Sequence, residues 1–271
     1  MNAIYSLYRS FVEKNRLKKR KKEAKKYAGY GVVCEICGSE FRNFAPFGIT
    51  QRENARCHLC NSLERHRLIY KYFNEKTTLF RPNRKIKVLH FAPENFLYNI
   101  LSQNPNIEYI PCDINPKLYK YRGKTKIVKV DITDIPFDDN CFDVIICNHV
   151  LEHVIDDKLA MSELYRVMKS GGWGMFQIPM SGWGYFPKSI DSKRSVTFED
   201  PSIVKPEERE KTFGQNDHVR LYGADYKQRL ESAGFSVIED DFVQQMPEKD
   251  LFKFGFMPAE IIYICRKEKE E

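Results

Sequence analysis

The sequence predicts an α/β fold built around a mostly parallel sheet of about seven strands. From residue 86 onward, short apolar runs alternate with segments of helical periodicity, which is the pattern of strand–helix–strand units. Acidic or polar residues follow three of these runs, at the edge where an open parallel sheet binds its ligands. A chain of 271 residues with 42% hydrophobic content can form one large domain and a small module.

The predicted elements follow one another in a regular order. The expected strands are Ile86–Phe91, Ile107–Cys112, Lys126–Val130, Phe142–Cys147, Trp173–Ile178, Phe235–Ile238 and Glu260–Cys265. Helices are expected near 68–73, 95–101, 156–168 and 224–232. The helix over 156–168 should turn Leu159, Leu164, Val167 and Met168 toward the sheet. It should end at Ser170-Gly171-Gly172, since glycine favours helix ends.

Two pairs of cysteines precede the predicted sheet. Cys34 and Cys37 form one CxxC pair, Cys57 and Cys60 form the other, and 19 residues separate the pairs. This spacing is typical of a four-thiolate zinc site, which is usually closed and structural. The other four cysteines fall in or beside predicted strands, where we expect them to pack in the core. Eight cysteines without a secretory signal indicate a reducing compartment.

The first 30 residues form a basic arm. They hold ten Lys or Arg and two Glu, a net charge of +8, whereas the whole chain carries +7. Apolar residues at helical spacing between positions 4 and 12 precede a polybasic run from Arg16 to Lys26. Residues 1–26 are expected to dock on the chain's own domain, to contact an anionic membrane surface, or to bind nucleic acid. We favour docking, and the near-neutral remainder of the chain disfavours nucleic acid.

Three strand ends carry the first indication of a ligand. Asp113, Asp131 and Asn148 directly follow the second, third and fourth predicted strands. Asp113 lies 23 residues after His90, and an acid at about this interval can accept both hydroxyls of a ribose. These strand ends therefore suit an adenosine cofactor. The alternative is that each Asp only caps a turn.

Several segments, in order and spacing, resemble the class I S-adenosylmethionine-dependent methyltransferases. The resemblance covers about Ile86 to Arg266, and its closest matches are Asp131–Phe137, Phe142–His153, Glu163–Gly172 and Tyr222–Tyr226. It implies a Rossmann-like, doubly wound, seven-stranded sheet that binds S-adenosylmethionine. One subgroup of that family is similar in joining an N-terminal zinc ribbon to the sequence His-Phe-Ala-Pro-Glu, which here spans residues 90–94.

The resemblance implies roles for the residues that match. Asp113, with Ile114 beside it, would hold the ribose, whereas Asp131 and Ile132 would border the adenine. Asn148 would lie under the methionine portion of the cofactor, as would His149.

The turn after the first strand departs from the family pattern because it contains no glycine. Pro93 within it also lacks an N–H donor. We expect His90, Ala92 and Glu94 to contact the cofactor in place of glycine backbone. If the turn has lost this ability, the chain is a non-catalytic zinc-ribbon binding protein on a degenerate methyltransferase fold.

A second motif overlaps the fourth strand end. His149-x-x-Glu152-His153 matches the inverted zinc-protease pattern, in which two histidines on a helix hold zinc and the glutamate acts as a base. Because the motif follows a predicted buried strand, we favour methyl transfer over this metalloprotease alternative.

Histidines also provide candidates for a catalytic base, namely His149, His153 and His218. A base assists methyl transfer when the acceptor is a hydroxyl. Arg220 is expected to pair with an anionic substrate group. Residues 180–220 would form a cap whose aromatic residues line a pocket or make a small satellite core.

The predicted organisation is a basic helical arm (1–30), a zinc ribbon (31–68) and a methyltransferase domain (69–271) with a cap insertion at about 180–220. The predicted reaction is S-adenosylmethionine-dependent methylation of a small-molecule or glycan-type acceptor, at a hydroxyl. No apolar run reaches the roughly 18 residues of a membrane span. We therefore expect a cytoplasmic protein, with peripheral contact at the inner membrane face as the alternative for the arm.

Overall fold

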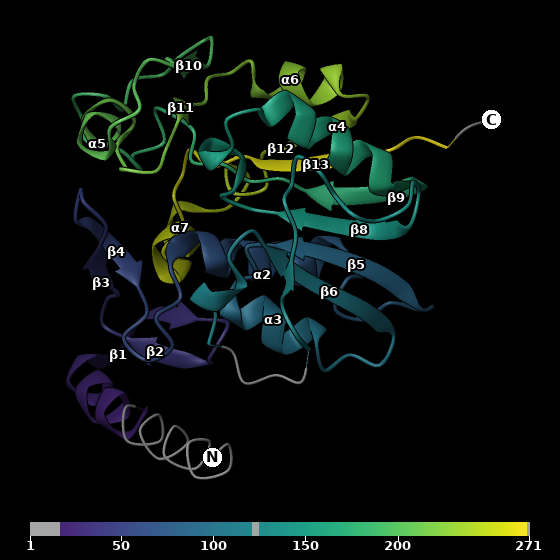
Figure 1. Cartoon of the computed structure of the whole chain (residues 1–271). Coiled ribbons are helices and arrows are strands. Elements are labelled where there is room, and N and C mark those ends of the chain that lie inside the picture. Colours follow the sequence, from purple (N-terminus) through teal and green to yellow (C-terminus); the bar gives the residue numbers. More distant parts are fainter. Residues whose placement is uncertain (1–16, 121–124, 270–271) are drawn as a thin grey trace, which may run out of the picture. The chain divides into compact units, whose positions relative to one another are not determined.

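The computed structural model describes residues 17–120 and 125–269, which fall into two compact units (Figure 1). The first unit combines the chain up to Tyr72 with the segment Met246–Pro258. The second unit combines Phe73–Gln245 with the segment that starts at Ala259. The predicted boundaries assign 246–258 to the methyltransferase domain, and no sequence pattern indicates that this segment joins the first unit.

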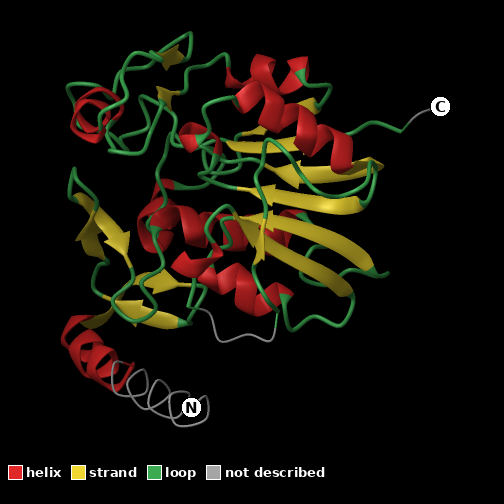
Figure 2. Cartoon of the chain, in the orientation of Figure 1, coloured by secondary structure: helices red, strands yellow, loops and turns green. Residues whose placement is uncertain are grey.

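A seven-stranded sheet forms the centre of the second unit, and Figure 2 shows its strands side by side in yellow. The strand order is β12-β13-β9-β8-β5-β6-β7. The strands are β5 (Ile86–Phe91), β6 (Ile107–Asp113), β7 (Val128–Lys129), β8 (Phe142–Cys147), β9 (Met168–Met175), β12 (Ser236–Asp240) and β13 (Ile262–Arg266). Only β13 pairs antiparallel with its neighbours, β9 and β12. The predicted Rossmann-like sheet of seven mostly parallel strands is confirmed.

Helices follow the strands in the order that the hydrophobic pattern predicts. They are α3 (Asn95–Leu101) after β5, α4 (Asp157–Val167) after β8 and α6 (Tyr226–Ser232) before β12. The side chain of Asp156 accepts a hydrogen bond from the backbone N–H of Leu159 at 3.0 Å, which explains why α4 begins there. The apolar faces of α4 and α6 and the sheet enclose a core, in which Cys112, Cys147 and Cys265 are fully buried as predicted.

The end of α4 differs from the prediction. The helix stops at Val167, and Met168 already has an extended backbone (φ −73°, ψ 134°). Met168 is fully buried and pairs with Phe142 of β8, so strand pairing ends the helix before the glycines are reached. Leu159 was also predicted wrongly, because its side chain is exposed.

The segment predicted as an irregular cap contains regular elements of its own. It holds the short strands β10 (Phe198–Glu199) and β11 (Arg220–Leu221) and the helix α5 (Pro206–Phe213), which lie together in Figure 1. Phe186, Phe213 and Leu221 form a small buried cluster between them. This cluster corresponds to the satellite core that the sequence left open as one alternative.

The first unit contains two small antiparallel hairpins. One pairs β1 (Ala28–Cys34) with β2 (Ser39–Phe41), and the other pairs β3 (Ala45–Phe47) with β4 (Arg52–Arg56). The helix α2 (Glu64–Lys76) begins in this unit, and α7 (Glu248–Phe254) belongs to it. A core that includes Val32, Phe41 and Phe44 lies beside the cysteines.

Buried Arg67 holds α7 within the first unit. Its guanidinium donates hydrogen bonds to the carbonyls of Phe254 and Gly255 from α7, and to those of Ala55 and Ser62. It also stacks 3.9 Å from the ring centroid of Phe44. Arg67 is therefore part of the interior of the first unit.

The apolar stripe predicted between positions 4 and 12 lies outside the described residues. Residues 17–24 are helical, followed by a 3-10 turn, η1 (Lys25–Tyr27), and β1. In the two described stretches, 17–120 and 125–269, no helix is both long and apolar enough to cross a membrane.

Candidate functional site

The carboxyl ends of β5, β6 and β8 meet at one edge of the sheet. Phe91 pairs with Cys112 on one side and with Cys147 on the other, so the three strands end level. Three adjacent loops therefore leave this edge, and the residues at which they leave it are Ala92, Asp113 and Asn148. This edge is where an open α/β sheet binds ligands.

A buried chain of hydrogen bonds joins the first of these strand ends to the last. The Nε2 atom of His90 lies 2.7 Å from Oε2 of Glu94, and its Nδ1 lies 2.8 Å from the hydroxyl of Tyr109. The amide nitrogen of Asn148 donates to Oε1 of Glu94 at 3.2 Å. The structure thus brings together His90, Glu94 and Asn148, as the sequence predicted for one site.

The glycine-free turn adopts a backbone conformation that glycine normally provides. Ala92 has φ 45°, in the left-handed region, and its N–H donates to the carbonyl of Cys112 at 3.0 Å. Glu94 precedes α3 but makes no side-chain cap, because its carboxylate faces His90 and Asn148. The backbone N–H of Ala92 and the carboxylate of Glu94 therefore both hold the turn in its conformation.

Asp113 ends β6 with both carboxylate oxygens engaged in local hydrogen bonds. Oδ1 accepts from the backbone N–H of Asn115 at 2.7 Å, and Oδ2 accepts from the hydroxyl of Tyr119 at 2.6 Å. A carboxylate has about four acceptor positions, so capacity remains for two ribose hydroxyls. Ile114 beside it is largely exposed at 61%.

The third strand end combines an exposed acid, Asp131, with a buried neighbour, Ile132. Oδ1 of Asp131 accepts from the backbone N–H of Thr133 at 2.9 Å and from its hydroxyl at 2.7 Å, and these bonds lower the pKa of Asp131. Ile132 is buried in the core with Ile135. The backbone N–H of Val130 donates to the carbonyl of Asp113, so the segment that leads from β7 to Asp131 lies beside the end of β6.

A second polar cluster follows Asn148. His149 has φ 55°, and its Nδ1 lies 3.5 Å from Oε1 of buried Glu152. Nε2 of His153 lies 3.9 Å from the same oxygen, and the ring of His218 lies 4.8 Å from the ring of His153. The three histidines proposed as bases therefore surround one carboxylate.

The histidines also set the charge state of Glu152. Burial raises the pKa of this carboxyl, but the hydrogen bond from His149 and the nearby imidazoles outweigh burial and lower its pKa to about 2. Burial lowers the pKa of His218, which favours its neutral form.

The predicted zinc-protease geometry is absent from this segment. Residues 151–153 form a single 3-10 turn, η3 (Leu151–His153), and not the α-helix that the motif requires. Of the described residues that could share a metal ion here, Glu152 and His153 group with His218 and not with His149.

Arg220 is not available to an anionic substrate, contrary to the prediction. It is 3% exposed, and its guanidinium donates to the carbonyls of Leu151, Val154 and Ile155. Its Nε also lies 2.9 Å from Glu199. Arg220 therefore shapes the turn that carries Glu152.

Gln177 supports the same edge but escaped the sequence analysis. Its backbone N–H donates to Asn148 at 3.2 Å, and its carbonyl accepts from the N–H of His149 at 2.7 Å. Its side chain bonds both Ile261 and Tyr263 beside β13. A glutamine just beyond a strand carries no recognisable signal, so only the fold could identify it.

In the first unit, the four predicted metal ligands converge. Sγ of Cys34 lies 3.5 Å from Sγ of Cys60, and Sγ of Cys37 lies 3.7 Å from Sγ of Cys57. Four thiolates around one zinc ion would be about 3.8 Å apart, given Zn–S bonds near 2.3 Å. The donor set and its spacing therefore fit tetrahedral zinc.

Tight turns present these cysteines. The N–H of Gly38 donates to the carbonyl of Cys34 at 2.8 Å, and the N–H of Asn61 donates to that of Cys57 at 3.1 Å. Gly38 (φ 68°) and Asn61 (φ 60°) both have the left-handed backbone that closes such a turn.

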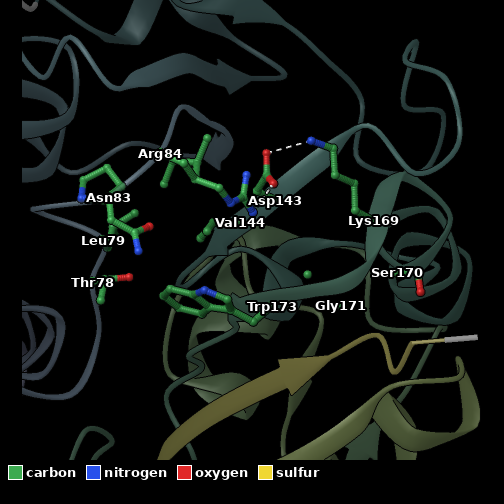
Figure 3. A pocket seen from close by; sticks show the side chains of 13 residues that line it. Thr78, Leu79, Asn83, Arg84, Asp143, Val144, Lys169, Ser170, Gly171 and Trp173 are labelled. Atoms are coloured by element: carbon green, nitrogen blue, oxygen red, sulfur yellow. Dashed lines mark hydrogen bonds and ion pairs between the residues drawn. The ribbon is translucent and has the colours of Figure 1, made fainter.

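A cavity of about 250 Å³ lies at the amino ends of β5, β8 and β9, whereas the candidate site lies beyond the carboxyl ends of β5, β6 and β8. Figure 3 shows side chains that line this cavity. It is lined by the start of β5, β8 and β9, including Ile86, Val144 and Trp173. Asp143 at its wall already pairs with Arg84 and Lys169, both at 2.8 Å. The cavity is therefore separate from the strand-end chemistry.

Comparisons with known proteins point to one kind of domain. The family described as "Methyltransferase domain" matches residues 94–176. An uncharacterised protein of Methanocaldococcus jannaschii is 36% identical over 75 residues, which is 28% of this chain and 32% of that protein. A ubiquinone/menaquinone biosynthesis C-methyltransferase of Idiomarina loihiensis is 42% identical over 75 residues, covering 24% of this chain and 30% of the relative.

The chain thus spans about a third of the length of the curated relatives it matches. A SAM-dependent methyltransferase of Archaeoglobus fulgidus has a similar solved structure, with 18% identity and a TM-score of 0.45 over 74% of this chain and 93% of that one. The matched family segment runs from Glu94 through the end of β9, so it contains the candidate edge beyond Ala92. Residues 94–176 are accordingly similar to a methyltransferase domain.

Proposed function

We propose that this chain transfers a methyl group from S-adenosylmethionine to a hydroxyl of a small-molecule or glycan-type acceptor. The observation that carries the proposal is the level ending of β5, β6 and β8, with Asp113 and Asn148 in adjacent loops. The match of 94–176 to a methyltransferase domain supports it.

The residues at this edge fit the cofactor by their chemistry. Asp113 retains acceptor capacity for the ribose, and Ala92 offers a small side chain in a glycine-like turn. His90 and Glu94 would hold the shape of that turn, while Asn148 would form a wall of the methionine pocket. When bound, S-adenosylmethionine supplies an electrophilic methyl group.

This chain's own contribution would be to position the acceptor and to receive its proton. An acceptor hydroxyl is a better nucleophile when a base takes its proton, and His149 follows Asn148 directly. Its contact with ionised Glu152 would stabilise the protonated imidazole. Zinc held by the four cysteines would be structural, since four thiolates leave no open position.

Calorimetric titration with S-adenosylmethionine tests the proposal. The wild-type chain should bind the cofactor and its demethylated product, and Asp113→Ala should weaken both at least about 10-fold, since each lost hydrogen bond to a charged group costs roughly 1.5–3 kcal/mol. Glu108→Gln is a matched control, because Glu108 is an exposed acid on the same strand.

The outcomes separate the alternatives. If neither compound binds the wild-type chain, the non-catalytic alternative replaces the enzyme. If Asp113→Ala binds as tightly as wild type, the cofactor lies elsewhere and the ribose assignment is wrong. Unchanged binding by Glu108→Gln shows that the loss is specific to the strand end.

A further inference from the structure

Glu152, His153 and His218 form a compact polar cluster inside the second unit. One potential ligand atom from each of the three lies within 4.8 Å of the others. Glu152 is 2% exposed and His218 is 1% exposed. Oε2 of Glu152 and Nε2 of His218 are buried and have no hydrogen-bond partner within residues 17–120 and 125–269. Two unsatisfied buried atoms of this kind require an explanation.

Hydrogen bonds fix which nitrogen of each imidazole faces the cluster. Nδ1 of His218 lies 3.2 Å from the carbonyl of Phe213, and Nδ1 of His153 lies 3.3 Å from the carbonyl of Asp217. A carbonyl can only accept, so Nδ1 carries the proton in both rings. In the neutral form of each ring the lone pair is then on Nε2, which is how metal-binding histidines are oriented.

In the described parts of the chain, Glu152 has no Lys or Arg partner. Arg220 on β11 is buried, but its guanidinium binds backbone carbonyls of the turn and Glu199. The contacts of Glu152 with His149 and His153 involve Oε1 alone. Oε2 is left without a partner, and an unsatisfied buried carboxylate oxygen is costly.

We propose that Glu152, His153 and His218 bind a divalent first-row transition-metal ion. Two imidazoles and one carboxylate suit zinc and its neighbours, whereas magnesium and calcium prefer oxygen ligands alone. Ligand atoms around one such ion would be about 3.4 Å apart, given bonds near 2.1 Å. The ligand atoms lie within 4.8 Å of one another, so they need to close in by at most about 1.4 Å.

The proposed ion would have both an entry path and open coordination positions. The side chain of His153 is 32% exposed, so the cluster reaches the surface. Three protein ligands leave at least one position for water or an acceptor oxygen.

Cobalt uptake by the full chain tests this proposal. The four-cysteine cluster would be loaded with zinc first, and cobalt(II) alone would then be titrated in. Wild type should bind one further ion per chain without thiolate-to-cobalt charge-transfer absorption. Glu152→Gln and His218→Gln should each weaken this binding at least about 100-fold, the upper end of what the loss of an outer-shell partner costs.

Matched controls guard against loss of fold. Glu163→Gln makes the same chemical change at another acid of the second unit, and Gln215→Ala alters an exposed residue near His218; both should bind cobalt as wild type does. Circular dichroism identifies variants that remain folded. Absence of a second ion in wild type overturns the proposal, as does wild-type affinity in folded Glu152→Gln and His218→Gln. Titration with magnesium alone should show no binding, and tight magnesium binding would contradict the assigned metal class.

Discussion

At the residue scale, two strand ends share an unusual backbone. Ala92 after β5 and His149 after β8 both have positive φ, at 45° and 55°. Left-handed backbone costs a non-glycine residue roughly 1–2 kcal/mol and tends to occur at functional sites. The lack of glycine in the first loop, which motivated the non-catalytic alternative, therefore leaves the shape of the turn intact. The sequence shows the missing glycine, but only coordinates show that alanine takes its conformation.

Ala92→Gly should stabilise the protein. Glycine removes the left-handed penalty but loses more entropy on folding, so we expect a net gain of about 0.5–1 kcal/mol in the free energy of unfolding. Urea denaturation measures this change. Ala233→Gly is the control, because Ala233 has φ −84° and should lose stability or stay unchanged. A loss of stability in Ala92→Gly would show that the turn is not strained.

At the scale of elements, α4 is fastened to the loop between β7 and β8. Arg166 on α4 donates two hydrogen bonds to Glu163, at 2.7 and 2.8 Å, and others to the carbonyls of Ile135 and Phe137. Glu163 in turn accepts from the N–H of Ile135 at 2.9 Å. These hydrogen bonds give a structural role to Glu163 and Arg166, which lie in the segment Glu163–Gly172 that resembles the methyltransferases.

Glu163→Gln should lower stability in a pH-dependent way. The hydrogen bonds from Arg166 lower the pKa of Glu163 in the folded chain. The stabilisation that ionised Glu163 contributes is therefore present above the pKa that this group has in the unfolded chain, and it is lost as the pH falls through the lower pKa of the folded chain. At pH 7 we expect a loss of about 1 kcal/mol, since the pair is partly exposed and screened.

Urea denaturation between pH 3 and 7 checks this expectation; the two chains should converge at the acid end. Asp138→Asn, an exposed acid in the same loop, should follow wild type throughout. A constant difference at every pH would show that the charge on Glu163 does not stabilise the fold.

Elements were predictable where local pattern and tertiary structure agree. The limits of β5 and β8 were predicted to the residue, because parallel strands that are largely buried have mostly apolar sequences. The end of α4 was not predictable, because Met168 is taken into the sheet by Phe142, which is distant in sequence. The proximity of Glu152 to His218 was not predictable for the same reason, because the two residues are distant in sequence. The cysteine spacing and Asp113, by contrast, are local signals.

At the scale of the whole molecule, each unit has its own core and its own candidate chemistry. The first unit is small, and small domains commonly need a metal to remain folded. Its buried cluster contains Cys34 and Cys57 themselves, so the proposed zinc would lie against the core. The second unit has an extensive hydrophobic core, and every residue of β8 is buried.

Removal of zinc should therefore unfold one unit and spare the other. A strong chelator, or Cys57→Ser, should abolish amide-exchange protection in β1, β2 and α7, because structural zinc contributes roughly 10–16 kcal/mol of apparent binding free energy. Protection in β5 and β8 should persist. Hydrogen-exchange mass spectrometry with zinc quantification measures both.

The control is Cys141→Ser, which removes a half-buried thiol from the second unit and should release no zinc. Uniform loss of protection in both units would show that they unfold together. Full protection after zinc release would show that the first unit does not need the ion.

The division of the chain has a consequence for how the protein is made. The helix α7 belongs to the first unit but follows most of the second unit in the sequence. During translation, Arg67 therefore cannot donate hydrogen bonds to the carbonyls of Phe254 and Gly255 until most of the second unit has left the ribosome. The nascent first unit therefore lacks two of the hydrogen bonds of the Arg67 guanidinium during most of translation. Expression of residues 17–72 by themselves, however carefully the amino-terminal boundary is chosen, would reproduce that unfinished intermediate.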